Sequence, residues 1–238
     1  MPAASVPALS IIIPTFNEAA AIGPLLARLR AEAFATPLEL ELIVADGGST
    51  DATAALAAAA GARVLACPRQ GRAAQLNQGA ADASGPVLYF LHADSYPPPG
   101  FSEDIWRAVA AGAGSGCYRL AFDHPHWFLR LSAWLTRFPL TWFRFGDQSL
   151  FVRKALFEQV GGYREALLVM EDQEIVERLQ RAAPFWLLPR AVVTSARRYL
   201  ANGVFRLQGI FALIVLLYRL GVPQARLRQV YKALVKGG

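Results

Sequence analysis

The sequence predicts an α/β protein with a mostly parallel sheet, helices on the faces of that sheet, and a helical tail at the C-terminus. Three observations predict this class. Short apolar runs alternate with helix-forming segments through the first hundred residues, a pattern typical of parallel sheets covered by helices. The chain has 238 residues, 54% of them hydrophobic, which is enough to bury a full core. After residue 200, only helix patterns remain.

Strand and helix patterns follow one another regularly in the first half. Each predicted strand is an apolar run, and each predicted helix follows a short polar connection. We predict strands at 9–14, 38–46, 62–67 and 86–94, with helices between them at 18–33, 51–60 and 71–83.

The second half is mixed, and we expect one continuous domain over 8–200, with halves 8–98 and 99–200, followed by a helical extension at 201–238. The predicted elements are a helix at 101–111, a strand at 116–122, an aromatic and basic segment at 126–145, a strand at 149–153, a helix at 171–183, short strands near Trp186 and Val192, and helices at 204–220 and 223–235.

Composition narrows the class of protein without choosing a function. The net charge of +6 favours anionic partners, which include nucleotide phosphates, acidic lipid head groups and nucleic acid. Cys67 and Cys117 fit no zinc or redox spacing and indicate a reduced, cytoplasmic chain. The N-terminus lacks the features of a signal peptide, so we expect no export. The apolar run at 209–218 is too short to cross a bilayer and is typical of a buried or interfacial helix.

Polar residues stand at the ends of two predicted strands. In PTFNEAAAI, Thr15 and Glu18 have the spacing of a capping box, which on its own is the favoured explanation of both residues. The functional alternative is that 14–18, at the tip of the first strand, border a nucleoside. In IVADGGSTDATAAL, Asp46 directly ends the second strand. No capping role requires it, because the Ser-Thr-Asp run that follows is placed to cap the next helix.

The stretch VLYFLHADSYPPPG carries a histidine and a carboxylate to the end of the fourth strand. Side chains alternate along a strand, so His92 and Asp94 are predicted to point to one side. Open α/β sheets bind ligands at the carboxyl ends of their strands. A divalent cation that binds nucleotide phosphates needs only one or two protein ligands, whereas a structural zinc site would need more than this stretch offers.

Charged residues also begin two predicted helices. Arg72, like Arg69 just before it, opposes the helix dipole, which is consistent either with a bound phosphate or with a solvated surface arginine. In LLVMEDQEIVERLQ, Asp172 shares a helical face with three apolar residues, so it is predicted to point inward. Glu171 lies toward the more polar side and is predicted to be solvated. Asp172 then either bonds the helix N-terminus or acts as a general base in a cleft.

Several site classes are excluded by the motifs that the sequence lacks. There is no G-x-x-x-x-G-K-[ST] loop and no G-x-G-x-x-G after the first strand, so neither a P-loop protein nor an ordinary dinucleotide-binding protein is indicated. No Ser-His-Asp or Cys-His arrangement is suggested by the three histidines.

Six segments, taken in order, resemble the family-2, GT-A-type inverting glycosyltransferases. They are IIIPTFNE, LIVADGGSTDAT, GRAAQLNQGA, LHADS, GDQSLFVRKALFEQVGGY and MEDQEIVERL, and the likeness covers roughly residues 8–200. The chain looks most like the compact bacterial group named for its association with radical SAM and selenium-domain genes. The resemblance implies a GT-A fold and transfer of a sugar from a nucleotide-diphosphate sugar, with UDP as the expected nucleotide.

The resemblance also implies roles for individual residues. It puts Asp172 in the place of the catalytic base, and HADS in the place of the Asp-x-Asp element, with Asp94 and His92 at a Mg²⁺ or Mn²⁺ ion. The implied nucleotide-binding residues are Pro14, Thr15, Asn17, Glu18, Asp46, Arg72 and Ala93. Those implied near the acceptor or diphosphate are Asp147, Gln148, Glu171, Arg197 and Arg198.

The sequence departs from the family pattern at two points. His92 stands where the first acid of Asp-x-Asp is expected, and the Q-x-x-R-W element of processive synthases is replaced by SARRY, which predicts transfer of a single sugar. Two alternatives stay open. A sugar-phosphate nucleotidylyltransferase would require a Gly-rich basic loop after the first strand. A non-catalytic nucleotide-binding or membrane-associated module would not require Asp94 and Asp172.

The segment at 126–145 bears on the acceptor. Trp127, Phe128, Trp134, Phe138, Trp142 and Phe143 alternate with Arg130, Arg137 and Arg144, a composition that suits either an anionic membrane surface or an aromatic core packed on the sheet. The first alternative predicts a lipid or other apolar acceptor and a peripheral position on the inner face of the membrane. We expect no nucleic acid partner.

Overall fold

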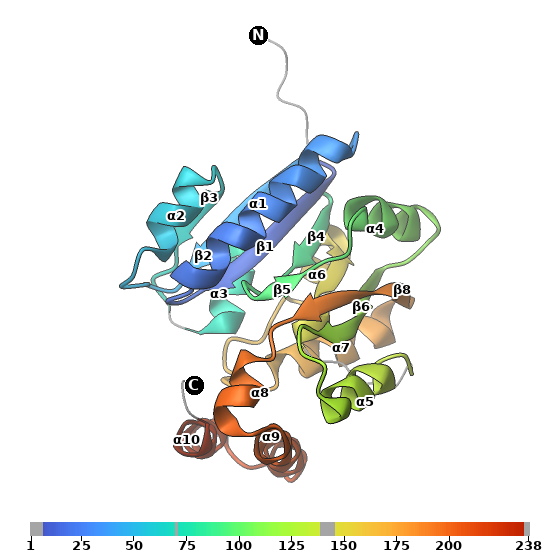
Figure 1. The fold of residues 1–238 in the computed structure, drawn as a ribbon. Coiled ribbons are helices and arrows are strands. Elements are labelled where there is room, and N and C mark those ends of the chain that lie inside the picture. Colours follow the sequence, from blue (N-terminus) through green and yellow to red (C-terminus); the bar gives the residue numbers. More distant parts are fainter. Residues whose placement is uncertain (1–6, 70, 139–145, 236–238) are drawn as a thin grey trace.

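The computed structural model describes residues 7–69, 71–138 and 146–235, and in these residues the strands form one eight-stranded sheet (Figure 1). The strand order is β3-β2-β1-β4-β7-β6-β8-β5. β7 is antiparallel to β4 and β6, β5 is antiparallel to β8, and the other pairs are parallel. The predicted class, a mostly parallel sheet with helices on its faces and a helical C-terminus, is confirmed.

All the described strands except β5 follow the predicted apolar runs. Their bounds are β1 Leu9–Thr15, β2 Leu40–Asp46, β3 Arg63–Ala66, β4 Val87–Phe90, β5 Ser95–Tyr96, β6 Ser115–Phe122, β7 Leu150–Arg153 and β8 Phe185–Thr194.

The helices occupy the segments between the strands and the end of the chain. They are α1 Ala19–Ala35, α2 Thr53–Ala59, α3 Arg72–Asp82, α4 Phe101–Ala110, α5 Trp127–Leu135, α6 Lys154–Gln159, α7 Glu171–Ala182, α8 Arg197–Asn202, α9 Val204–Arg219 and α10 Gln224–Leu234, with a short 3-10 turn at Gly146–Gln148 before β7.

Two apolar cores lie on opposite faces of the sheet. In β1 the side chains of Ile11 and Ile13 pack with α1, α2 and α4, while Ile12 packs with α3, α6 and α7 on the other face. This alternation follows from strand geometry and explains why the strand is apolar at every core position. A third cluster, around Leu207 and Ile210 of α9, packs α9 against α10 and α8.

The structure differs from the predicted elements in three places. The fourth strand ends at Phe90, four residues earlier than predicted, so His92 and Asp94 lie in the turn after it. The two short strands predicted near Trp186 and Val192 are one continuous strand, β8, whose pairing with β6 shifts register between Tyr118 and Arg119. The elements β5, α6 and α8 were not predicted, because each is six residues or shorter, and the helix α5 lies in the aromatic and basic segment, for which no secondary structure was predicted.

Candidate active site

The segments that carry the predicted site residues meet at one edge of the sheet. β1, β2, β4 and β8 run in one direction and β7 in the other. The loops that follow β1, β2, β4 and β8 and the turn before β7 therefore lie at the same edge of the sheet. At β1 the chain has β2 on one side and β4 on the other. Such a point, where the strand order reverses, is where open α/β sheets form a ligand crevice.

Asp46 organises the loop after β2. Its carboxylate accepts hydrogen bonds from the hydroxyls of Thr15, at 3.0 Å, and Ser49, at 2.5 Å, and from the backbone N–H groups of Gly48 and Ser49. Burial raises the pKa of Asp46, but these hydrogen bonds outweigh it and lower the pKa. The expectation that no helix cap requires Asp46 is confirmed, because the two N–H groups belong to the turn after β2 and not to α2, which begins at Thr53.

The predicted capping box at Thr15 and Glu18 was wrong. Thr15 is the last residue of β1, and its hydroxyl bonds Asp46 on the neighbouring strand rather than a helix N–H. Glu18 precedes α1 but makes no side-chain cap. Instead Glu18 Oε2 lies 2.6 Å from Arg197 Nη2, and the same nitrogen lies 3.6 Å from Asp94 Oδ2. One guanidinium thus bridges the loops after β1 and β4 from the start of α8.

His92 is held by the turn before β7. Its Nδ1 lies 3.2 Å from Asp147 Oδ1. Burial raises the pKa of Asp147, but the hydrogen bond from His92 and nearby positive charges, which include Arg72 and Arg198, lower it. An ionised carboxylate only accepts hydrogen bonds, so Nδ1 carries the hydrogen. In the neutral ring Nε2 then keeps a free lone pair, the arrangement found when a histidine is oriented to bind a metal.

Arg72 faces a pair of adjacent carboxylates at the start of α7. Its Nη1 lies 3.4 Å from Glu171 Oε1 and 3.4 Å from Asp172 Oδ2. The anion that compensates Arg72 at the start of α3 is therefore this pair. Glu171 is only 7% exposed, so the prediction that it is solvated was wrong. Burial and the charge of Asp172 raise the pKa of Glu171, and Arg72 lowers it in part.

Four other predicted site residues are part of the strands and turns or bond to neighbouring elements. Pro14 lies within β1, and Ala93 is buried in the turn after β4. Gln148 is buried, and its side chain donates to the carbonyl of Tyr118 in β6. Arg198 donates to the Tyr231 hydroxyl of α10, at 2.7 Å. It therefore points toward the C-terminal helices, while Arg197 points toward the strand ends.

Gln75 is a site-shaping residue that the sequence reasoning missed. It is buried on α3, and its Nε2 donates to the carbonyls of Thr15 and Ala45, each at 2.8 Å. It thereby joins the ends of β1 and β2. The available signal was a polar residue among the apolar positions of the predicted helix at 71–83, since buried polar groups are kept when they are hydrogen-bonded.

Strained backbone is concentrated around these residues. Among the residues described, only Asn17, Ser149 and Met170 have a positive φ without being glycine. Each lies next to a predicted site residue: Glu18, Gln148 and Glu171. Conformations of this kind cost free energy and cluster at functional sites, where the surrounding structure holds them. At these three positions, contacts with the surrounding structure therefore hold the backbone in a conformation that its own residue disfavours.

Gly146, in the turn before β7, lies against the side chains of His92 and Asp172. A Cβ atom at this position would overlap Asp172 Oδ2 and lie 2.9 Å from His92 Cε1. We expect Gly146→Ala to displace both side chains and lower turnover by about 10²-fold, since small misplacements at a reacting centre have effects of that size. The melting temperature should change little, because both groups are the ends of partly exposed side chains. Gly23→Ala in α1, where a Cβ meets no atom within 4 Å, is the matched control, and equal turnover of the two variants would contradict the prediction.

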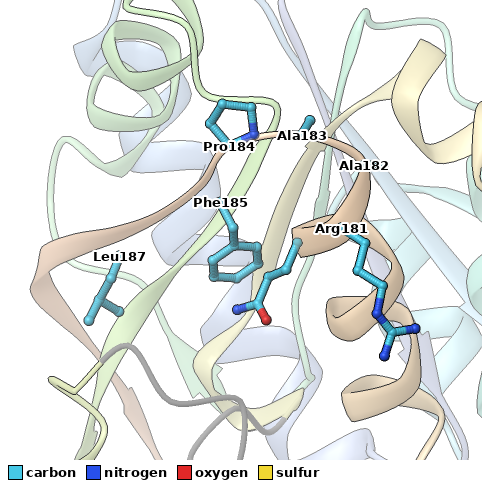
Figure 2. Close-up of a pocket in the computed structure, with 7 residues that line it drawn as sticks. Arg181, Ala182, Ala183, Pro184, Phe185 and Leu187 are labelled. Atoms are coloured by element: carbon cyan, nitrogen blue, oxygen red, sulfur yellow. The ribbon is translucent and has the colours of Figure 1, made fainter.

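A pocket of about 490 Å³ lies elsewhere, at the C-terminal end of α7 and the start of β8 (Figure 2). Its lining comes from residues 180–185 and 187, and Figure 2 shows the ring of Phe185 among them. Asp172 is nine residues before Arg181 on α7, which corresponds to roughly 14 Å along a helix. The pocket contains none of the predicted site residues and is not the candidate active site.

The donor groups at the edge fit a divalent cation that is bound together with a diphosphate. No group of three or more His, Cys, Asp or Glu side chains gathers as a metal cluster in the part of the chain that the structure describes. A phosphate-bound Mg²⁺ or Mn²⁺ keeps waters and needs only one or two protein ligands. Asp94 offers a carboxylate that already attracts the Arg197 cation, and His92 offers Nε2 two residues away.

A protein-family comparison and a comparison with curated proteins give concordant matches. The family described as "Glycosyl transferase family 2" matches residues 10–157. The succinoglycan biosynthesis protein ExoA of Rhizobium meliloti (strain 1021) is 30% identical over 193 residues, covering 72% of this chain and 58% of ExoA. A dodecaprenyl-phosphate galacturonate synthase of Rhizobium johnstonii is 49% identical over 45 residues, which is 19% of this chain and 13% of that protein.

Solved structures share the fold. The mannosyltransferase PcManGT from Pyrobaculum calidifontis, in complex with GDP-Man and Mn²⁺, superposes with a TM-score of 0.67 at 19% identity, over 89% of this chain and 63% of that one. Glucosyl-3-phosphoglycerate synthase from Mycobacterium tuberculosis, in complex with Mn²⁺, UDP and glucosyl-3-phosphoglycerate, gives 0.59 at 18% identity, over 94% and 86%. At these identities the likeness concerns the GT-A fold alone.

Proposed function

The chain belongs to glycosyl transferase family 2, and from that membership we propose that it transfers one sugar from a nucleotide-diphosphate sugar to an acceptor, with inversion at the anomeric carbon. The observation that carries the proposal is that two groups of charged side chains stand at one sheet edge. In one, Arg72 pairs with Asp172, and Asp172 and His92 both lie against Gly146; in the other, Arg197 pairs with Asp94. A diphosphate is an anion, so a site that binds it needs positive charge. Arg72 and Arg197 supply two guanidinium groups next to the carboxylates at this edge.

We propose that the nucleoside lies against residues 14–18 and Asp46, and that the diphosphate lies toward Asp94 and Arg72. UDP is the proposed nucleotide. Asp94, with His92, would hold a Mg²⁺ or Mn²⁺ ion, which offsets negative charge on the leaving diphosphate when it is bound. Arg197 now pairs with both Glu18 and Asp94, so it is also placed to contact a phosphate at this position.

Asp172 is the proposed general base. The nucleophilic O–H of the acceptor, on a hydroxyl or on a singly protonated phosphate, loses its proton to the Asp172 carboxylate as its oxygen bonds the anomeric carbon, and the bond from that carbon to the diphosphate oxygen breaks with its electron pair on the diphosphate. Arg72 offsets the combined negative charge of Glu171 and Asp172. Asp147 acts on His92 rather than on substrate, by holding the ring through Nδ1.

An apolar lipid, such as a polyprenyl phosphate, is the proposed acceptor class. The relative named as a dodecaprenyl-phosphate galacturonate synthase supports this choice, although it matches only a short part of the chain. The absence of Q-x-x-R-W from the sequence supports transfer of a single sugar rather than processive synthesis. Within the family, we assign the chain on its motifs to the compact bacterial group associated with radical SAM and selenium-domain genes.

Donor turnover tests the proposal. The purified protein is incubated with UDP-sugars and GDP-sugars, Mn²⁺ and polyprenyl phosphate, and nucleotide release and new lipid products are followed by mass spectrometry. We expect UDP release with one glycosylated lipid product. Pyrophosphate formation from a nucleoside triphosphate and a sugar 1-phosphate would favour a nucleotidylyltransferase instead. UDP binding with no turnover of any donor would favour a non-catalytic module.

A further inference from the structure

The outer face of α9 is apolar along its whole length. Its exposed positions recur every three or four residues, so they form one stripe that spans an arc of about 100° on a regular helix. This outer stripe consists of Phe205, Gly209, Ala212, Leu213 and Leu216, and continues into Leu220 just past the helix end. Phe205, Leu216 and Leu220 are 57%, 56% and 71% exposed. The opposite face is also apolar, but it is buried against α10 and α8. α9 is therefore apolar on two faces, and the fold buries only one of them.

A second apolar stripe on α5 joins the outer stripe. The ring of Phe205 lies 4.9 Å from that of Phe128 and 5.9 Å from that of Trp127, between centroids. Trp127 is 63% exposed, Leu131 and Trp134 continue the exposed apolar positions one and two turns along, and exposed Phe138 follows just past the end of α5. Leu129 of α5 is buried against Ala196 and Val204, which fixes α5 beside the start of α9. The segment at 126–145 thus has both buried and exposed apolar residues, and Trp142, Phe143 and Arg144 lie outside the described residues.

Charge along the sequence is strongly segregated around these stripes. No Asp or Glu follows Glu177, and the last 61 residues carry 11 Lys and Arg residues. The segment between Asp123 and Asp147, which contains α5, also has no Asp or Glu. On a regular helix, Arg206 and Arg219 fall at the two edges of the outer stripe. An apolar strip with arginine on both sides and tryptophan at one end has the composition of a surface that enters a membrane interface.

We propose that the face formed by the exposed residues of α5 and α9 docks the protein on an anionic bilayer. The apolar stripes enter the interface, and the arginines lie at the level of the phosphate head groups. Among the described residues, no helix combines the length and the apolar character that crossing a bilayer requires. A second copy of the chain is a poorer occupant, because two such faces in contact would bring the arginines of one against those of the other.

The docking face lies at the same end of the molecule as the candidate active site. α8 links β8 to α9, and Arg197 at its first position reaches Glu18 and Asp94 (Figure 1). Docking would therefore bring the site near the head-group layer. The idea that membrane docking serves a lipid acceptor rests on the proposed function. The membrane contact itself requires neither a nucleotide nor turnover.

Vesicle co-sedimentation without any nucleotide tests the proposal. We compare vesicles of phosphatidylcholine alone with vesicles that contain 30% phosphatidylglycerol, at low and high salt. The wild-type protein should bind the anionic vesicles, and weakly or not at all the neutral ones. L213S/L216S should reduce the partition coefficient at least about tenfold, because two exposed leucines no longer enter the apolar layer. Phe34→Ser, at an 89% exposed phenylalanine of α1 outside the docking face, is the matched control and should bind like wild type.

Each other outcome would overturn the proposal. It fails if the wild-type protein stays in the supernatant, if neutral and anionic vesicles bind equally, or if L213S/L216S binds like Phe34→Ser. It also fails if light scattering shows a wild-type dimer that L213S/L216S converts to monomer, since the occupant is then a second copy. Circular dichroism controls for folding of each variant. Donor turnover in detergent micelles distinguishes the two proposals, because it tests the transfer reaction where no bilayer is present.

Discussion

Asp172→Asn is expected to lower turnover by about 10²–10⁴-fold, the usual contribution of a positioned general base. The amide keeps the shape of the side chain and its place beside Arg72 Nη1, 3.4 Å away, but it cannot accept the acceptor proton. UDP affinity should stay close to that of the wild type, because the proposed base contacts the acceptor. Steady-state turnover, with UDP binding by titration calorimetry as the check on folding, measures both quantities.

The choice of control for this variant follows from the structure. Glu171→Gln does not serve, because Glu171 is buried and shares Arg72 with Asp172, so its loss also changes the charge around the proposed base. Glu177→Gln is better matched. Glu177 lies on the same helix, about a turn and a half further along, and pairs with Arg181 and Arg219 away from the strand ends. If Asp172→Asn and Glu177→Gln turned over equally fast, the base would have to be another residue.

The sheet could be predicted because its information is local. β1, β2 and β4 are buried on both faces by helices, so they are apolar at almost every position and stand out against the polar loops. The carboxyl-end location of the site followed from the same pattern, since parallel strands place their carboxyl ends together. What the pattern left open was the point at which β4 ends, because Leu91 still bonds Ile12 of β1 after the regular ladder has stopped.

The charge pairs of the site could not be predicted, because their partners are far apart in the sequence. Glu18 and Arg197 are separated by 179 residues, and His92 and Asp147 by 55. The error at Glu171 has the same origin. Helical periodicity placed it toward the polar side of α7, but Arg72 of α3 packs against that end of the helix and buries it. Similarly, Thr15 looked like a cap because its partner, Asp46, lies on the next strand.

Asp94→Asn is expected to remove most of the increase in UDP affinity that Mn²⁺ provides, a loss of at least about tenfold. In wild type, titration of UDP with Mn²⁺ and then with EDTA should give two affinities, and the difference between them is the contribution of the cation. The variant loses one anionic oxygen ligand, so its affinity in Mn²⁺ should fall toward the EDTA value. Its affinity in EDTA should stay close to that of wild type, since Glu18 still holds Arg197 at 2.6 Å.

His92→Ala should have a smaller effect, because an imidazole is a weaker partner than a carboxylate for these hard cations. Glu103→Gln, which removes a surface carboxylate paired with Arg107 on α4, controls for the loss of one negative charge. A Mn²⁺-dependent increase in Asp94→Asn as large as in wild type would show that the cation is held elsewhere.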